Sequence, residues 1–321
     1  MDVSHNEIFA YDLDGKGSGK EINYQNFQKN KKPTWIHADY KSKNFHQWLF
    51  KKSGIDEIIC EALVEKTTHP RTFLTSNGIL IVLRDENIDE QAEPEDLQSV
   101  RIWIDNEKMI STSARLQPSI QAVEASIKNN TGPATLGECL VDMIEHITDK
   151  IDSIIEETNQ KVDELEKQMF RIQSHKFRLS VLDIRHQIID LRRHLTAQRD
   201  VISRLASEQL TWFSDLDCMQ LREYADRNMR FIEDLEVARD DTTVLQELIA
   251  NTVSEKVESR MYVLSMVAAI FLPLSFLASL LGINVAGIPG AEGRWAFAIV
   301  SLLMVLLAVI EYWIFKKKKW F

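Results

Sequence analysis

The spacing of hydrophobic positions changes twice along the chain and predicts three regions, residues 1–132, 133–260 and 261–321. In the first region, short apolar runs are separated by polar residues and turn signals, as in a mixed α/β domain. In the second, apolar residues recur at steps of three and four, the spacing of one helix face. The third contains two apolar runs of about 20 residues, each long enough to span a membrane. The expected fold is an α+β domain, then long coiled-coil-like helices, then two C-terminal transmembrane helices.

Two pairs of short strands are expected in the first region. Arg71–Thr75 and Gly78–Arg84 are joined near Asn77-Gly78, a dipeptide that favours the turn of a β-hairpin. Apolar and more polar residues alternate over Val100–Asp105, which predicts a half-buried strand, and Met109–Ser113 is its expected partner. Two short helices and one exposed acidic loop are also expected, at Phe45–Phe50, Ile55–Leu63 and Asp85–Asp96.

Three long helices are expected in the second region. Their apolar stripes run over Leu140–Met169, Phe177–Leu205 and Leu221–Thr252, and the last stripe follows a heptad pattern. The outer face of the first helix is acidic and that of the second is basic, which suggests that the two pair, although such faces are more often simply solvated. No Pro or Gly interrupts Leu216–Arg260, so the third helix is expected to continue into the first apolar run. The whole helix, from Leu216 to Leu281, would be roughly 100 Å long. It is either a rod that transmits a conformational signal or a spacer.

The third region predicts a helical hairpin in the membrane. The apolar runs are Tyr262–Leu281 and Trp295–Phe315, and the segment between them is rich in glycine. Lys256 and Arg260 precede the first run, and a basic group that we call the lysine collar follows the second. The positive-inside rule then places both termini in the cytoplasm of a multi-pass protein of the cell inner membrane. The collar consists of Lys316, Lys317, Lys318 and Lys319.

Composition narrows the function classes. The net charge of −10 disfavours a nucleic-acid binder. The N-terminus lacks the basic and apolar segments of a secretory signal, and three scattered cysteines form no disulfide framework or zinc knuckle. No catalytic motif is evident, so we expect a protein that is not an enzyme and has no cofactor.

The first apolar run is the better candidate to line a pore. Two helices cannot enclose water, so a pore needs several copies of the chain. Small, hydroxyl and apolar residues share one face of the first run and would line a narrow, mildly polar channel, although such residues also serve close helix packing. This candidate pore face comprises Met261, Leu264, Ser265, Ala268, Leu272, Ser275 and Ser279.

The triplet Gly282-Ile283-Asn284 follows the first run directly. Here the chain resembles the CorA metal-ion transporter family, whose signature is Gly-Met-Asn or a Gly-x-Asn variant at this place. The isoleucine and the following 287–290 (Gly-Ile-Pro-Gly) are similar to the ZntB zinc-transporter branch. The resemblance implies a funnel-shaped homopentamer with a ring of Asn284 at the outer pore mouth. It also implies a hydrophobic constriction at Met261 and Leu264, for which ordinary packing at the membrane entry is the alternative.

The function expected is transport of divalent metal cations through a homopentameric pore in lipid, with zinc favoured and proton coupling left open. The first run contains no Asp, Glu, His or Cys, so zinc would have to pass largely hydrated, and the metal-binding residues are not identified. Glu311 is the one ionisable residue well inside either run, either functional or directed toward the lysine collar. The alternatives are a magnesium, cobalt or nickel channel of the same fold, or a membrane-anchored coiled-coil scaffold or sensor.

Overall fold

The computed structural model describes residues 8–29, 32–66, 68–87, 97–169, 175–208, 210–283 and 293–317. The chain divides into two compact units, residues 1–246 and 247–321, which are described separately. The helix α6 (Asp215–Leu281) contributes residues to both. The three-region division at residues 132/133 and 260/261 stays a prediction.

The first unit is built on a seven-stranded mixed sheet with the order β2-β1-β3-β7-β6-β5-β4. The only parallel pairing in this described sheet joins β3 to β7, and every other neighbour is antiparallel. The strands are β1 (Ile8–Leu13), β2 (Gly19–Glu21), β3 (Thr34–Asp39), β4 (Arg71–Leu74), β5 (Ile79–Asp85), β6 (Gln98–Ile104) and β7 (Lys108–Ser113).

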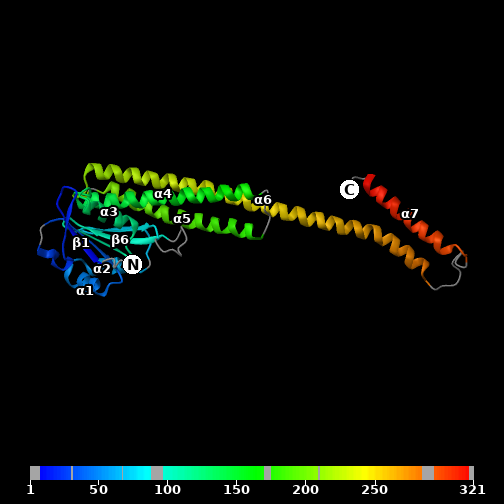
Figure 1. Ribbon diagram of the computed structural model, residues 1–321, viewed down its shortest axis with the longest axis horizontal. Coiled ribbons are helices and arrows are strands. Elements are labelled where there is room, and N and C mark those ends of the chain that lie inside the picture. The colour runs from blue at the N-terminus through cyan, green and yellow to red at the C-terminus, as the bar shows by residue number, and fades with distance from the viewer. Residues whose placement is uncertain are drawn as a thin grey trace. The chain divides into compact units, whose positions relative to one another are not determined.

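Helices cover both faces of the sheet (Figure 1). On one face, α1 (Lys43–Lys52) and α2 (Glu57–Val64) bury Phe45, Trp48 and Leu63 in a core with Leu80 and Trp103 of the strands. On the other face a larger core joins the sheet to a helical layer. That layer consists of α3 (Pro118–Lys128), α4 (Leu136–Met169), α5 (His175–Ser207) and the first part of α6; a short 3₁₀ helix, η1, spans Tyr24–Lys29.

The predicted hairpin between β4 and β5 is confirmed, but Gly78 does not have the role in the turn that was expected of it. The Thr75 N–H donates to the Gly78 carbonyl oxygen (2.9 Å), so Asn77-Gly78 is not the centre of the turn. A Cβ at Gly78 would lie 2.5 Å from the Ile104 carbonyl oxygen and 2.7 Å from the Trp103 ring. Glycine is therefore required here by close packing against β6.

The prediction that β6 is half-buried is wrong. Val100, Ile102 and Ile104 face the helical layer, while Arg101 (1% exposed) and Trp103 are buried on the opposite face. The Arg101 guanidinium donates to the carbonyl oxygens of Ser99 and Lys66 and lies over the Tyr40 ring. Because these contacts replace water around the charge, a polar position that the alternation assigned to solvent is buried.

The expected exposed loop at 85–96 is also corrected at its first residue. Asp85 ends β5 and is fully buried. Its carboxylate accepts hydrogen bonds from the Ser119 backbone N–H (3.3 Å) and hydroxyl (2.5 Å). These bonds fasten the first turn of α3 to the sheet. Residues 88–96 lie outside the described residues.

The three long helices are confirmed, and their buried residues follow the predicted stripes, except that burial on α6 ends at Leu245, before Ile249 and Thr252. α4 packs against α5, as their opposite charges suggested, but the charges themselves pair elsewhere. Among the residues that the structure describes, no ion pair joins α4 to α5. Instead Arg227 of α6 contacts Asp149 and Asp152 of α4, and Arg192 of α5 contacts Glu236 of α6. α6 therefore carries the charged contacts of both neighbours.

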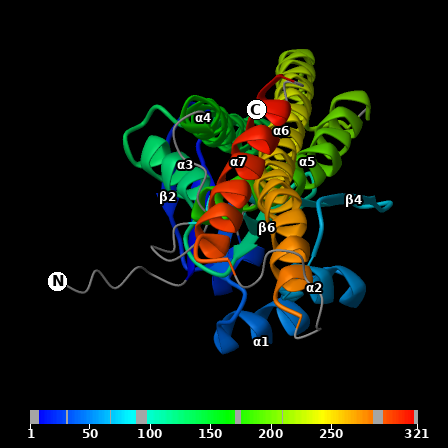
Figure 2. The ribbon, with the colours of Figure 1, turned by 90° about the vertical axis from the view of Figure 1, so that its right-hand side faces the viewer.

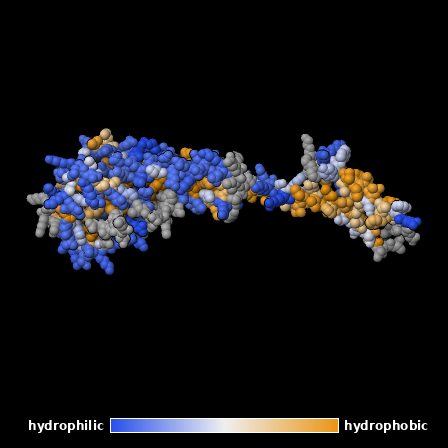
Figure 3. Space-filling model, viewed as in Figure 1, coloured by the Kyte–Doolittle hydropathy of each residue, from blue (hydrophilic) through white to orange (hydrophobic). Residues whose placement is uncertain are grey.

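The second unit is an apolar hairpin formed by residues 247–281 of α6 and by α7 (Ala296–Lys317). Both helices are long and apolar enough to cross a membrane. Hydrophobic residues gather over this part of the molecule (Figure 3). Pro273 lies inside α6 without ending it, as a proline can in a transmembrane helix.

Candidate functional site

The candidate pore face lies on α6 and is exposed along its whole length in the single chain. Leu272 is 71% exposed and Leu264 is 64% exposed. A second stripe of α6 is half-buried; it comprises Met266, Ile270, Pro273, Leu274 and Leu277. At 3.6 residues per turn the centres of the two stripes are about 180° apart. The predicted residues are thus brought together on one face, opposite the half-buried stripe.

The helix α7 returns beside the end of α6 within the same unit, as the two ribbon views show (Figures 1 and 2). It has a half-buried stripe of its own, which includes Val300, Met304 and Leu307. Because each helix has a single half-buried stripe, the candidate pore face of α6 is left for contact with something outside this chain.

Three serines give the candidate pore face its chemistry. Ser265, Ser275 and Ser279 are exposed, and their hydroxyls have no hydrogen-bond partner within the described part of the chain. A hydroxyl that faces hydrocarbon without a partner is unfavourable, whereas water or a second helix satisfies it. The face therefore suits either a wet channel wall or a contact between copies of the chain.

The predicted pore mouth is described only in part. Gly282 follows the last turn of α6, and its N–H donates to the Ala278 carbonyl oxygen (2.9 Å). Its φ is not positive, so its backbone does not use the left-handed region that favours glycine. Ile283 is 48% exposed. Asn284 and the segment 287–290 lie outside the described residues.

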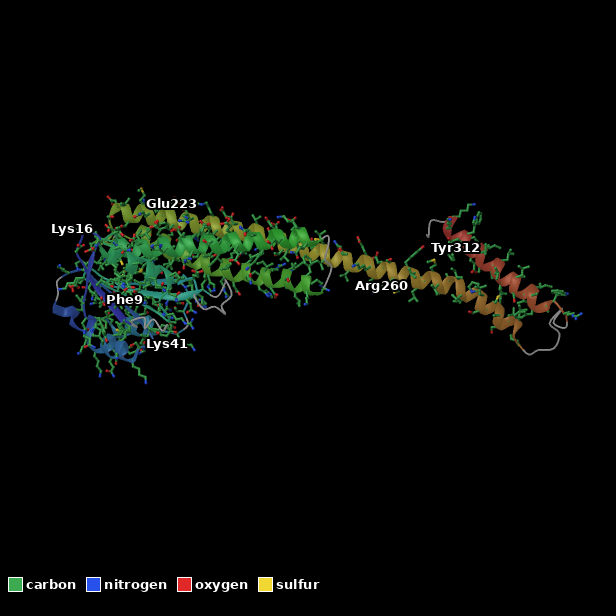
Figure 4. The ribbon with its side chains drawn as sticks, in the orientation of Figure 1. Phe9, Lys16, Lys41, Glu223, Arg260 and Tyr312 are labelled. Carbon is green, nitrogen blue, oxygen red and sulfur yellow. The ribbon has the colours of Figure 1, made fainter. Side chains whose placement is uncertain are left out.

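The opposite end of the hairpin carries the predicted constriction and collar. Met261, at the start of the candidate pore face, is exposed, and Arg260 precedes it on α6 (Figure 4). Lys316 and Lys317 end α7, with the Lys317 Nζ 5.1 Å from the centre of the Trp313 ring. Lys318 and Lys319 lie outside the described residues. Glu311 is half-buried on α7, and one of its carboxylate oxygens has no hydrogen-bond partner in the described structure.

The acidic face of α4 offers carboxylates, which are the oxygen ligands that divalent cations such as Ca²⁺ use. Arg227 neutralises part of it through Asp149 (2.8 Å) and Asp152 (3.2 Å). Nearer the start of α4, burial and then the carboxylate of Glu145 raise the pKa of Asp142 to about 6. The described residues contain no group of three or more acidic, histidine or cysteine side chains arranged to hold a metal ion. The structure thus assigns no metal ligands in this region.

Sequence reasoning missed a groove with a volume of about 450 Å³ in the first unit. It lies where α4 and α6 begin, beside the segment that joins α5 to α6. Its described lining comes from four separate stretches of chain, and no local sequence pattern signals it. The lining includes Pro33, Asn106, Leu136, Glu138, Trp212, Phe213 and Asp217.

The fold and the exposed hydroxyl face define the class of protein. A helix-covered mixed sheet, a long helix that continues into an apolar span, and a second span directly after it together form a two-span membrane protein of the CorA architecture. The chain belongs to this family, because the model of the CorA-like Mg2+ transporter protein matches residues 30–317.

Curated relatives match over nearly the whole chain. Zinc transport protein ZntB of Pectobacterium carotovorum is 35% identical over 313 residues, which cover 98% of this chain and 95% of the relative. Divalent cation transporter CmaX of Pseudomonas aeruginosa is 32% identical over 319 residues, with 98% and 96% covered. A solved structure of full-length CmaX is 30% identical, has a TM-score of 0.83, and covers 99% of this chain and 100% of its own. The resemblance read from Gly282-Ile283-Asn284 is confirmed.

Proposed function

We propose that this protein transports divalent metal cations across the inner membrane through a pore shared by five copies of the chain, with zinc as the favoured cargo. The candidate pore face of α6 would line the pore, and α7 would face lipid. The exposed face with its three unpartnered hydroxyls, opposite the half-buried stripe, is the observation that carries the proposal. In a homopentamer these hydroxyls meet water, which removes the cost of leaving them in hydrocarbon.

The pore mouth follows from the position of Gly282-Ile283-Asn284 directly after α6. Five Asn284 side chains would present amide oxygens to the water shell of a hydrated cation. Hydrogen bonds to that shell need no dehydration, which suits a span that offers no carboxylate, imidazole or thiolate ligand. At the other end, Met261 and Leu264 would form a hydrophobic constriction that closes by dewetting.

The names of the relatives support divalent cations as the class of cargo and zinc as the favoured member. A relative at 35% identity is a zinc transport protein, and one at 32% is a divalent cation transporter. The family model refers to magnesium, so a magnesium, cobalt or nickel channel is the second candidate. The regions 1–132, 133–260 and 261–321 would act as cytoplasmic domain, stalk and membrane hairpin. Both termini, with the lysine collar, would face the cytoplasm.

Flux through reconstituted liposomes tests this function. The purified protein is compared with Asn284→Ala for uptake of zinc, magnesium, cobalt and nickel, with and without an imposed pH gradient. Asn77→Ala is the matched control, because Asn77 is an exposed asparagine in the β4–β5 turn of the first unit. Oligomeric mass is measured on every variant.

We expect zinc uptake by the parent and by Asn77→Ala, loss of uptake by Asn284→Ala, and a pentameric mass for all three. A pH gradient that changes zinc uptake supports coupling, and one without effect indicates passive conduction. Uptake of magnesium with exclusion of zinc favours the second candidate. A stable monomer, or a pentamer that passes no metal, refutes transport and leaves a membrane-anchored scaffold or sensor.

A further inference from the structure

The groove at the start of α4 and α6 has two polar walls made by helix caps. At α4, the Thr135 hydroxyl accepts from the Glu138 N–H (3.1 Å), and the Glu138 carboxylate accepts from the Ala134 N–H (2.6 Å). At α6, the Ser214 hydroxyl accepts from the Asp217 N–H (3.1 Å), and the Asp217 carboxylate accepts from the Ser214 N–H (2.8 Å). These reciprocal bonds fix both carboxylates on the lining of the groove. Each uses one oxygen for its cap.

The third wall is aromatic. Trp212 and Phe213 lie in the segment between α5 and α6, with ring centres 4.7 Å apart, and both line the groove. Both side chains are half-buried and pack against the main core of the unit, so their rings are held in place. Leu136 and Pro33 add to the apolar lining. Asn106 and Thr211 also line the groove, and the Thr211 hydroxyl donates to the Asn106 side-chain oxygen (2.9 Å).

The described lining of the groove includes two acidic side chains, Glu138 and Asp217. The carboxylates of Glu138 and Asp217 are among the charges that raise the pKa of Asp142, after burial and Glu145. Among the described residues, the lining contains no lysine or arginine to balance them. The positive ends of the two helix dipoles, each about half a unit charge, offset only part of the two negative charges.

We propose that the groove binds a small organic ammonium ion between the aromatic wall and the carboxylates of Glu138 and Asp217. A cation over an indole ring gains a cation–π attraction, and its N–H groups can donate to the free carboxylate oxygens. The volume of about 450 Å³ falls in the range of small-ligand sites. A bare metal ion would leave the aromatic wall unused, so an organic cation matches more of the lining.

The proposal is tested by measuring the binding of putrescine to the full-length protein in detergent with titration calorimetry. 1,4-Butanediol is the neutral control with the same carbon chain, and sodium chloride controls for ionic strength. Glu138→Gln removes a charge but keeps an oxygen that can cap α4, and Trp212→Leu removes the ring but keeps an apolar side chain. Glu223→Gln is the matched control, because Glu223 is exposed on α6 and pairs with Arg230 (Figure 4).

We expect saturable binding of putrescine, no binding of butanediol, and affinities about tenfold weaker in Glu138→Gln and in Trp212→Leu. The Glu223→Gln variant should bind as the parent does. Circular dichroism confirms that each variant is folded. Absence of saturable putrescine binding overturns the proposal, and so does binding that neither groove variant weakens, since the ligand would then occupy another site.

Discussion

Replacement of Gly137 by alanine tests how closely α4 approaches the segment that leads into α6. A Cβ at this position would lie 2.4 Å from the Trp212 carbonyl oxygen, 3.1 Å from the Phe213 ring and 3.2 Å from the Asp217 carboxylate. The nearest obstacle is a backbone atom, which cannot rotate away. Alanine normally gains about 0.5–1 kcal/mol over glycine in a helix, whereas overpacking costs about 1–3 kcal/mol. The net loss should be about 1–2 kcal/mol.

This loss of stability is measured by thermal unfolding of the full chain in detergent, with circular dichroism as the signal. For a unit of this size, the melting temperature of Gly137→Ala should fall by about 2–6 °C. Leu216→Ala is the control, because Leu216 occupies the equivalent second position of α6 and is 58% exposed. That variant should melt within about 1–2 °C of the parent. A Gly137→Ala protein at least as stable as the parent would refute the close approach of the two helix starts.

Three further outcomes are expected. Because the pKa of Asp142 is raised from 3.8 to about 6, the native state holds this proton more tightly than the unfolded chain, and stability falls as pH rises through 6. Asp142→Asn should therefore raise the free energy of unfolding at pH 8 by about 1 kcal/mol, after allowance for solvent screening, and so raise the melting temperature there. At pH 4 the substitution should change the melting temperature little. An equal effect at both pH values contradicts this. Arg227→Met removes the contacts to Asp149 and Asp152 and should cost about 1 kcal/mol at low salt, with a smaller loss at 1 M salt in the same melting assay. In a Cys218→Ser background, Ser275→Cys should react with a membrane-impermeant thiol reagent several-fold faster than Leu274→Cys, because thiolate forms in water; equal rates would argue against a wet face.

The long helices could be predicted because each buries one regular stripe, and a stripe is visible in the sequence alone. The packing of α4 against α5 was also predicted and is found, but the partners of their charged residues could not be predicted. Arg192 of α5 and Asp149 of α4 belong to charged faces that looked complementary, yet each contacts α6 instead, through Glu236 and Arg227. Charge pairing depends on which faces the apolar contacts bring together, and single-helix periodicity carries no information about that.

Buried polar residues were the main source of error in the sheet. Arg101 and Asp85 were assigned to solvent because charged side chains are rarely buried. Each is satisfied by groups distant in sequence, Arg101 by the Lys66 carbonyl and the Tyr40 ring, Asp85 by Ser119. Such partners appear only once the strands are in register.

The part of the candidate site that lies on a single helix could be predicted from the sequence. The seven residues of the candidate pore face share one side of α6 because a helical face follows directly from spacing. The groove lined by Glu138, Trp212 and Asp217 could not be predicted, because four chain segments converge to make it.

The parallel pairing of β3 with β7 affects the order in which the strands of the first unit come together during folding. β4, β5, β6 and β7 form successive antiparallel neighbours, so each can add to the one before it after a short loop closes. The other three strands join only when Thr34 meets Lys108, far along the chain. Contacts of such long sequence separation form slowly. In pulse-labelling hydrogen exchange during refolding, amide protons of β5 and β6 should gain protection before those of β1 and β3.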